Sequence, residues 1–139
     1  MNTTPRALSK GDALRAYARM LNHLSVDYLE PLLAEDFHYA SQNVFSEMTN
    51  KAQFLDYMRG KLETIKREGA RVWAELGKVD AQVAVLSARG QPCLIIAQGN
   101  KNNPVATLLV EVEGQKIKRC DICIIPEPQS AKRTGEYPL

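Results

Sequence analysis

The chain has 139 residues, 45% of them hydrophobic and 24% charged, with a formal net charge of +2. These values fit one globular domain that buries its own core without metals or disulfides. The small net charge argues against a nucleic-acid partner, and no segment reaches the ~20 apolar residues that cross a bilayer.

Helical patterns fill most of the first half. Ser9 with Asp12 predicts a helix start, and an apolar stripe follows at helical spacing: Leu14, Tyr17, Ala18, Leu21 and Leu24. A second, short helix is expected with Asp27 as its cap and Pro31 near its first turn. A third opens at Asn50 with Gln53, buries one face through Ile65 and ends at Gly69.

Strand patterns follow the helices and also interrupt them. They cover Phe37–Ser41, Val44–Met48, Arg71–Lys78, Gln82–Arg89, Cys93–Gln98, Val105–Val112 and Lys116–Ile125. Turns are predicted at Gly90-Gln91-Pro92, Gly99–Pro104 and Glu113-Gly114-Gln115. The segments Arg71–Lys78 and Gln82–Arg89 are either one bent strand or include one irregular strand.

The pattern divides the chain into an N-terminal extension (1–8), one domain (9–125) and a C-terminal tail (126–139). The tail is polar, has three prolines and lacks periodicity. It is expected to be mobile or to form an arm on a partner. The first residues lack the apolar run of a secretory signal, and three cysteines are an odd number. Both observations predict free thiols in the cytoplasm.

Two segments resemble the nuclear transport factor two-like superfamily, which includes polyketide cyclase-like and ketosteroid isomerase-like proteins. The first is Tyr17–Ser41 with its Leu33-Ala34-Glu35-Asp36-Phe37-His38-Tyr39 run, and the second is Glu113-Gly114-Gln115-Lys116-Ile117. The resemblance implies an α+β fold, with three N-terminal helices packed on a curved, mostly antiparallel sheet that forms a cone around an internal cavity. It also implies a homodimer through the outer sheet face. The chain departs from the family in showing seven strand segments where six are usual.

The same resemblance permits a comparison with ketosteroid isomerases. Tyr17 falls where those enzymes place an oxyanion-binding tyrosine. Ser41 falls at the position of their proton-transferring aspartate, and Leu108 near that of their second acid. A serine is no general base near neutral pH and a leucine donates no hydrogen bond, so ketosteroid isomerase activity is not expected.

The leading hypothesis is therefore binding of a small apolar molecule in the cavity, without catalysis. The predicted ligand-binding residues are Tyr17, Tyr28, Phe37, Tyr39, Ser41, Met58 and Cys120. One alternative is an isomerase, cyclase or dehydratase that uses Asp121, or an inward Glu47 or Glu75, as its acid or base. Another is a protein-interaction or dimerisation module that uses the outer sheet face and the tail.

Strand alternation places the remaining candidates. On Lys116–Ile125, Lys118, Cys120, Ile122 and Ile124 are expected to face the cavity, and Ile117, Arg119, Asp121 and Cys123 to face outward. Cys120 and Cys123 would then point apart, so neither a metal site nor a redox pair is expected, and no cofactor motif is found. Asp121 would form ion pairs with Arg119. His38 is expected on the outer face, and His23 at the end of the first helix.

Overall fold

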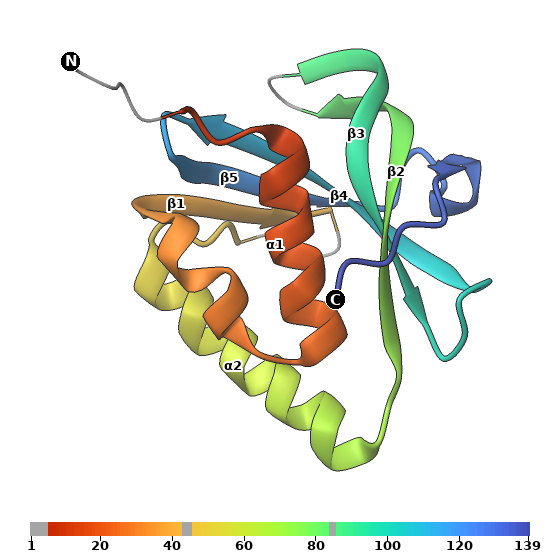
Figure 1. Cartoon of the computed structure of the whole chain (residues 1–139), viewed down its shortest axis with the longest axis horizontal. Helices are drawn as coiled ribbons and strands as arrows, with labels where there is room; N and C mark the ends of the chain where they lie inside the picture. Colours follow the sequence, from red (N-terminus) through yellow and green to blue (C-terminus); the bar gives the residue numbers. More distant parts are fainter. Residues whose placement is uncertain (1–5, 43–45, 84–85) are drawn as a thin grey trace.

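A computed structural model describes residues 6–42, 46–83 and 86–139, in which two long helices lie on the concave side of one sheet (Figure 1). The helices are α1 (Lys10–His23) and α2 (Lys51–Glu68). The strands are β1 (Leu33–Ser41), β2 (Val72–Val83), β3 (Leu86–Gln98), β4 (Pro104–Glu113), β5 (Lys116–Cys123) and β6 (Lys132–Arg133). Their order in the sheet is β1-β5-β4-β3-β2-β6, with β1 and β5 parallel and the other pairs antiparallel. The predicted α+β class with a curved, mostly antiparallel sheet is confirmed.

The ends of both long helices follow their capping residues. The Ser9 hydroxyl accepts a hydrogen bond from the Asp12 N–H at 3.0 Å, and the Asn50 side chain accepts one from the Gln53 N–H at 2.8 Å. Gly69 ends α2 with a positive φ of 65°, a conformation that costs glycine little. These boundaries agree with the prediction.

The predicted second helix is replaced by two short 3₁₀ turns, Val26–Tyr28 and Glu30–Leu32. The cap is Ser25 rather than Asp27, because the Asp27 N–H donates to the Ser25 hydroxyl at 3.3 Å. Pro31 lies at the start of the second turn, where its missing N–H costs no helical hydrogen bond. Leu33 already belongs to β1, which leaves no room for a longer helix.

The predicted turn at Gly90-Gln91-Pro92 is wrong, because these residues lie inside β3. The expected strand Gln82–Arg89 instead spans the end of β2 and the start of β3, and the residues between them, 84–85, lie outside the described part of the chain. The register of β3 with β4 runs only from Leu94 to Ala97. Pro92 therefore lies where β3 pairs with β2 alone, a place where a strand tolerates proline.

The expected strand Val44–Met48 lies partly outside the described residues, since 43–45 are not described. Within the described part, Met48 forms a single antiparallel bridge with Tyr39. Two backbone hydrogen bonds of 2.9 Å join these residues. This bridge adds a short wall beside the end of β1.

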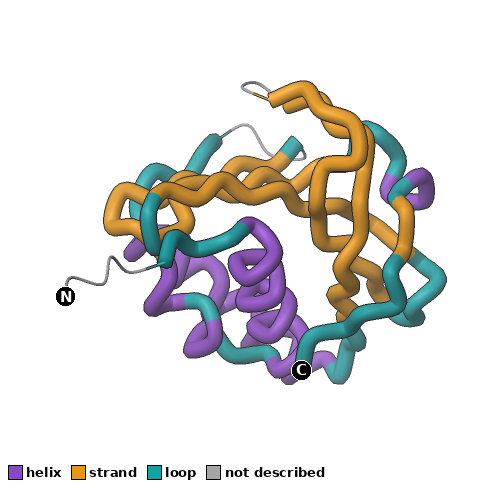
Figure 2. Tube along the Cα trace, turned by 45° about the horizontal axis from the view of Figure 1, so that its top comes forward, coloured by secondary structure: helices purple, strands orange, loops and turns teal. Residues whose placement is uncertain are grey.

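Buried side chains form two layers, one on each face of the sheet. The larger layer lies between the helices and the concave face, and Figure 2 shows the sheet curving around them. A smaller outer cluster lies on the convex face and contains Val79, Cys93, Ile95, Leu109, Cys123 and Ala131. Register shifts between Val79 and Ala81, and between Glu111 and Val112, mark the irregularities that bend such a sheet.

The C-terminal segment 126–139 packs on its own chain, in contrast to the expected mobile tail or partner-bound arm. Ala131 joins the outer cluster, and the Gln129 side chain donates to the Pro104 carbonyl at 3.1 Å. The next residues form β6 beside β2, and the segment then reaches α1, where Asn22 donates to the Pro138 carbonyl at 2.7 Å. The proline-rich composition thus fits an irregular segment that is fixed by hydrogen bonds.

Candidate functional site

A pocket of about 510 Å³ opens between α2 and the concave face of the sheet. It is lined by Tyr39, Ser41, Ser46, Met48, Tyr57, Lys61, Ile96, Gln98, Val105, Ala106 and Ile122. Tyr39 and Ser41 alternate along β1, so both face the helix side, opposite Cys120 and Ile122 of β5. Tyr57 and Lys61 are four residues apart on α2 and therefore share one helix face.

A cluster of aromatic rings extends from the pocket wall into the core behind it. Tyr39 lies 5.8 Å from Tyr57 and 5.1 Å from Phe54 between ring centroids, and Phe54 lies 6.4 Å from Tyr17. Burial raises the pKa of Tyr17 well above its ordinary value, and burial with the neighbouring Tyr57 does the same for the pKa of Tyr39. Both hydroxyls therefore stay protonated at neutral pH and can donate hydrogen bonds.

Of the seven predicted ligand-binding residues, Tyr39 and Ser41 line this pocket. Tyr17, Phe37, Met58 and Cys120 are at most 1% exposed and belong to the core behind it. The expectation that Tyr17 and Ser41 face one open cavity is therefore corrected: Ser41 lines this pocket, whereas Tyr17 is 1% exposed and does not line it.

Tyr28 also lies away from the pocket. It is 42% exposed and stacks on His23 at 4.6 Å between ring centroids. The 3₁₀ turn that replaces the expected helix carries Tyr28 to the surface beside the end of α1.

Tyr57 and Lys61 are pocket residues that the sequence pattern did not indicate. Both lie outside the apolar stripe of α2. That stripe identifies residues that face the core, so it does not identify residues at the rim of a pocket. Lys61 is the charged residue among those that line the pocket, and its Nζ lies 5.9 Å from the Tyr57 ring centroid. The available signal was their i, i+4 spacing, which is weak because many surface pairs share it.

The three candidate carboxylates lie outside this pocket. Arg119 binds Asp121 with two hydrogen bonds of 3.0 Å, and its guanidinium also lies 2.8 Å from Glu47. Glu47 in turn lies 2.6 Å from His38 Nδ1. Hydrogen bonds from His38 and Arg119 hold the pKa of Glu47 below its ordinary value. The predicted pairing of Arg119 with Asp121 is present, as part of a four-residue hydrogen-bonded network with Glu47 and His38.

Glu75 is the third carboxylate, and it is only 3% exposed. Its two oxygens accept hydrogen bonds from Arg133 Nε at 2.8 Å, the Gly135 N–H at 2.8 Å and the Tyr137 hydroxyl at 3.1 Å. All of these donors come from the C-terminal segment. Glu75 therefore anchors that segment rather than serving the pocket.

The cysteines follow the predicted alternation, with one change nearby. Cys120 belongs to the helix-side core, whereas Cys123 joins Cys93 in the outer cluster. Ile117 was expected to face outward but lies in the helix-side core, because the register between β4 and β5 shifts between Glu111 and Val112. Within the described residues, no group of three or more His, Cys, Asp or Glu side chains is placed to hold a metal ion.

Comparison with solved protein structures identifies the fold of this chain. No protein-family model and no curated protein sequence matches the chain. Among solved structures, a nuclear transport factor two-like protein of unknown function from Cytophaga hutchinsonii matches with a TM-score of 0.57 and 14% identity, over 92% of this chain and 97% of that one. A protein of unknown function with a cystatin-like fold from Methylobium petroleophilum matches with a TM-score of 0.57 and 13% identity, over 94% and 90%. A candidate polyketide cyclase from Sinorhizobium meliloti matches with a TM-score of 0.52 and 15% identity, over 81% and 94%.

The chain has the nuclear transport factor two-like fold. At these identities the likeness establishes the fold, which hosts unrelated activities, so the function has to be argued from the pocket. No helix in the described parts of the chain is long and apolar enough to span a bilayer.

Proposed function

We propose that this chain binds a small, largely apolar molecule in the pocket between α2 and the concave sheet face. The observation that carries the proposal is the lining. Apolar side chains form much of the wall, hydroxyl groups are placed among them, and no carboxylate is found among the described residues that line it. A volume of about 510 Å³ falls in the range of small-molecule pockets.

The polar groups define how such a molecule would be oriented. Tyr57 and Lys61 lie together on α2, and Ser41 faces them from β1. The Tyr57 hydroxyl and the Lys61 ammonium group offer hydrogen-bond donors on the α2 side of a largely apolar space. The preferred ligand therefore has an apolar body and one hydrogen-bond acceptor, such as a carbonyl or carboxylate oxygen.

An acid–base enzyme of the isomerase, cyclase or dehydratase kind is the second candidate. It would need a carboxylate in the pocket with a pKa suited to proton transfer. Asp121 and Glu47 are instead paired with Arg119, and Glu75 is occupied by the C-terminal segment. The geometry thus favours binding over acid–base catalysis.

A protein-interaction or dimerisation module is the third candidate. A homodimer through the outer sheet face was expected because that face is apolar, but the C-terminal segment already packs on its outer cluster. The dimer remains a prediction and would use the neighbouring surface around Arg119 and Glu47. Three buried, unpaired cysteines favour a reducing compartment such as the cytoplasm.

The test is to identify small molecules that stay with the protein. Chain purified without denaturant would be analysed by native mass spectrometry and then denatured, and the released compounds identified. We expect one apolar compound at near-stoichiometric amounts in the wild type and in Ser41→Ala, and its loss in Ser41→Phe, which fills the pocket. Equal retention by Ser41→Phe, with its fold intact by circular dichroism, would contradict binding at this pocket.

A further inference from the structure

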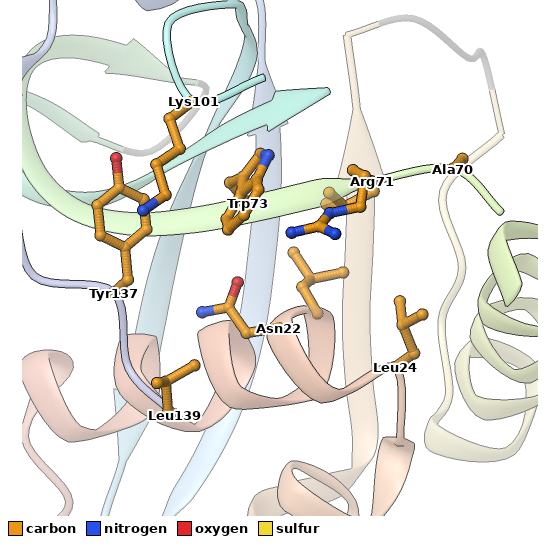
Figure 3. A pocket seen from close by; sticks show the side chains of 10 residues that line it. Asn22, Leu24, Ala70, Arg71, Trp73, Lys101, Tyr137 and Leu139 are labelled. Carbon is orange, nitrogen blue, oxygen red and sulfur yellow. The ribbon is translucent and has the colours of Figure 1, made fainter. Parts of the chain in front are cut away.

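A second pocket, of about 330 Å³, lies between the end of α1 and the start of β2 (Figure 3). Its walls come from four segments that are far apart in sequence: the end of α1, the start of β2, the loop between β3 and β4, and the C-terminal segment. None of its lining residues belongs to the first pocket. What it binds can therefore be tested independently of the function proposed above.

Two cations are held against aromatic rings in this pocket. The Arg71 guanidinium carbon lies 4.7 Å from the Trp73 ring centroid, and Lys101 Nζ lies 4.8 Å from the same centroid. Lys101 Nζ is also 4.5 Å from the ring centroid of Tyr137, which meets Trp73 edge-on at 6.5 Å. Figure 3 shows Arg71 and Lys101 approaching Trp73 from different sides. Both exposed charges therefore lie against the Trp73 ring, where cation–π attraction favours them.

The two charges lack an acidic partner. Among the described residues, no carboxylate of an Asp or Glu side chain lies within 4.0 Å of Arg71 or Lys101, although ten such pairs with other groups occur in the described part of the chain. The nearby Glu75 is engaged by Arg133. Two positive charges without an acidic partner favour the binding of an anion at this pocket.

Apolar side chains and one hydrogen-bonded asparagine form a further part of the wall. Leu21, Leu24 and Val72 give an apolar surface. The Asn22 amide donates to the Ala74 and Pro138 carbonyls and accepts from the Ala74 N–H, so its hydrogen bonds are used within the fold. Asn22 therefore shapes the pocket, and Arg71 and Lys101 supply charged hydrogen-bond donors for a ligand.

We propose that this pocket binds a small organic anion with an apolar body. Its carboxylate pairs with the Arg71 guanidinium, Lys101 adds positive charge on the other side of Trp73, and its apolar part packs against the leucines at the end of α1. Arg71 is suited to this role because its planar guanidinium can hold a carboxylate with two hydrogen bonds.

Trp73 provides a local readout, because it is the single tryptophan of the chain. Octanoate would be titrated into the wild type while tryptophan fluorescence is recorded, with octanol as the neutral control and sulfate as the anion without an apolar body. We expect a saturable change with octanoate, little with either control, and weaker binding as salt rises. The double variant Arg71→Met/Lys101→Met should bind octanoate about tenfold more weakly, because it removes two positive charges that are exposed and therefore screened by solvent.

Lys61→Met is the matched control, since it removes a lysine from the first pocket only, and it should leave the octanoate titration unchanged. The proposal is overturned if octanol binds as well as octanoate, if sulfate binds equally well, or if the double variant binds like the wild type while still folded by circular dichroism. A loss of signal in Lys61→Met would assign the octanoate to the first pocket instead. Because Ser41→Phe tests the first pocket alone, failure of one proposal leaves the other standing.

Discussion

The Tyr137 hydroxyl lies 3.1 Å from Glu75 Oε1, which joins the C-terminal segment to β2 at a carboxylate that is almost fully buried. Arg133 donates to both groups, with 2.8 Å to Glu75 and 2.7 Å to Tyr137. This three-residue contact forms one wall of the second pocket through Tyr137 and holds β6 at the sheet edge. It makes the last residues part of the fold.

Glu75→Gln should destabilise the protein by about 2 kcal/mol, because donors that now bind a buried carboxylate lose a charged acceptor. Glu63→Gln, at an exposed position on α2 without an ion pair among the described residues, should change stability by less than about 0.5 kcal/mol. Urea unfolding of the three proteins measures both values. Equal stability of the two variants would show that the contact does not hold the segment.

Two glycines should respond to alanine with opposite signs. A Cβ at Gly60 in α2 meets nothing within 4 Å, so Gly60→Ala should stabilise the protein by about 0.5–1 kcal/mol. A Cβ at Gly77 would lie 2.6 Å from Ile95 Cδ1 and 2.8 Å from the Lys132 carbonyl oxygen, so Gly77→Ala should destabilise it by about 1–3 kcal/mol. Thermal unfolding of both variants measures the two stability changes. Stability changes of the same sign in both variants would contradict the packing described around β6.

The network around Arg119 should make the stability of the protein depend on pH through Glu47. Its pKa in the folded protein is lowered from 4.5, mainly by His38 and then by Arg119. A carboxyl with a depressed folded pKa stabilises the protein above its unfolded pKa, and this contribution is lost as pH falls through the folded pKa. The stability difference between the wild type and Glu47→Gln should therefore shrink below about pH 4.5.

The effect should be small, because Glu47 is about one third exposed and solvent screens the pair. Urea unfolding at a series of pH values measures it, with Glu63→Gln as the control that shows no such trend. A difference that grows on acidification would reverse the sign and refute the pairing.

The three cysteines should be unreactive in the native protein. Burial raises the pKa of Cys93 to about 12 and that of Cys123 to about 11, and it raises the pKa of Cys120 well above its ordinary value. Because the thiolate is the reactive form, a thiol reagent such as Ellman's reagent should modify the folded chain very slowly at neutral pH. All three thiols should react once denaturant is added, and fewer than three would indicate a disulfide.

Ketosteroid isomerase activity should be absent. Ser41 lines the first pocket but offers no base, and Leu108 is fully buried and offers no hydrogen bond. The loss of a base and an oxyanion donor lowers the rate by several orders of magnitude. A spectrophotometric assay with a steroid enone would test this, and turnover abolished by Tyr17→Phe would contradict it.

Several features of the fold were predictable from the sequence because they depend on neighbouring residues. Ser9 and Asn50 cap helices through hydrogen bonds that span three residues, and Gly69 supplies a left-handed end. The hairpin at Gly114 follows the same local logic, and its φ is positive. Cys120 and Cys123 separate by simple strand alternation. Each of these features depends only on residues that are a few positions apart in the sequence.

The tertiary structure decided what depends on distant residues. Pro92 signalled a turn, yet β3 continues through it because β4 does not pair there. Tyr28 was predicted to bind the ligand, but the 3₁₀ turn Val26–Tyr28 places it at the surface. The second pocket joins Arg71, Lys101 and Tyr137, which no spacing in the sequence relates. Such contacts depend on the sheet register and on where each segment packs, and these are set by the free energy of the whole fold rather than by a local pattern.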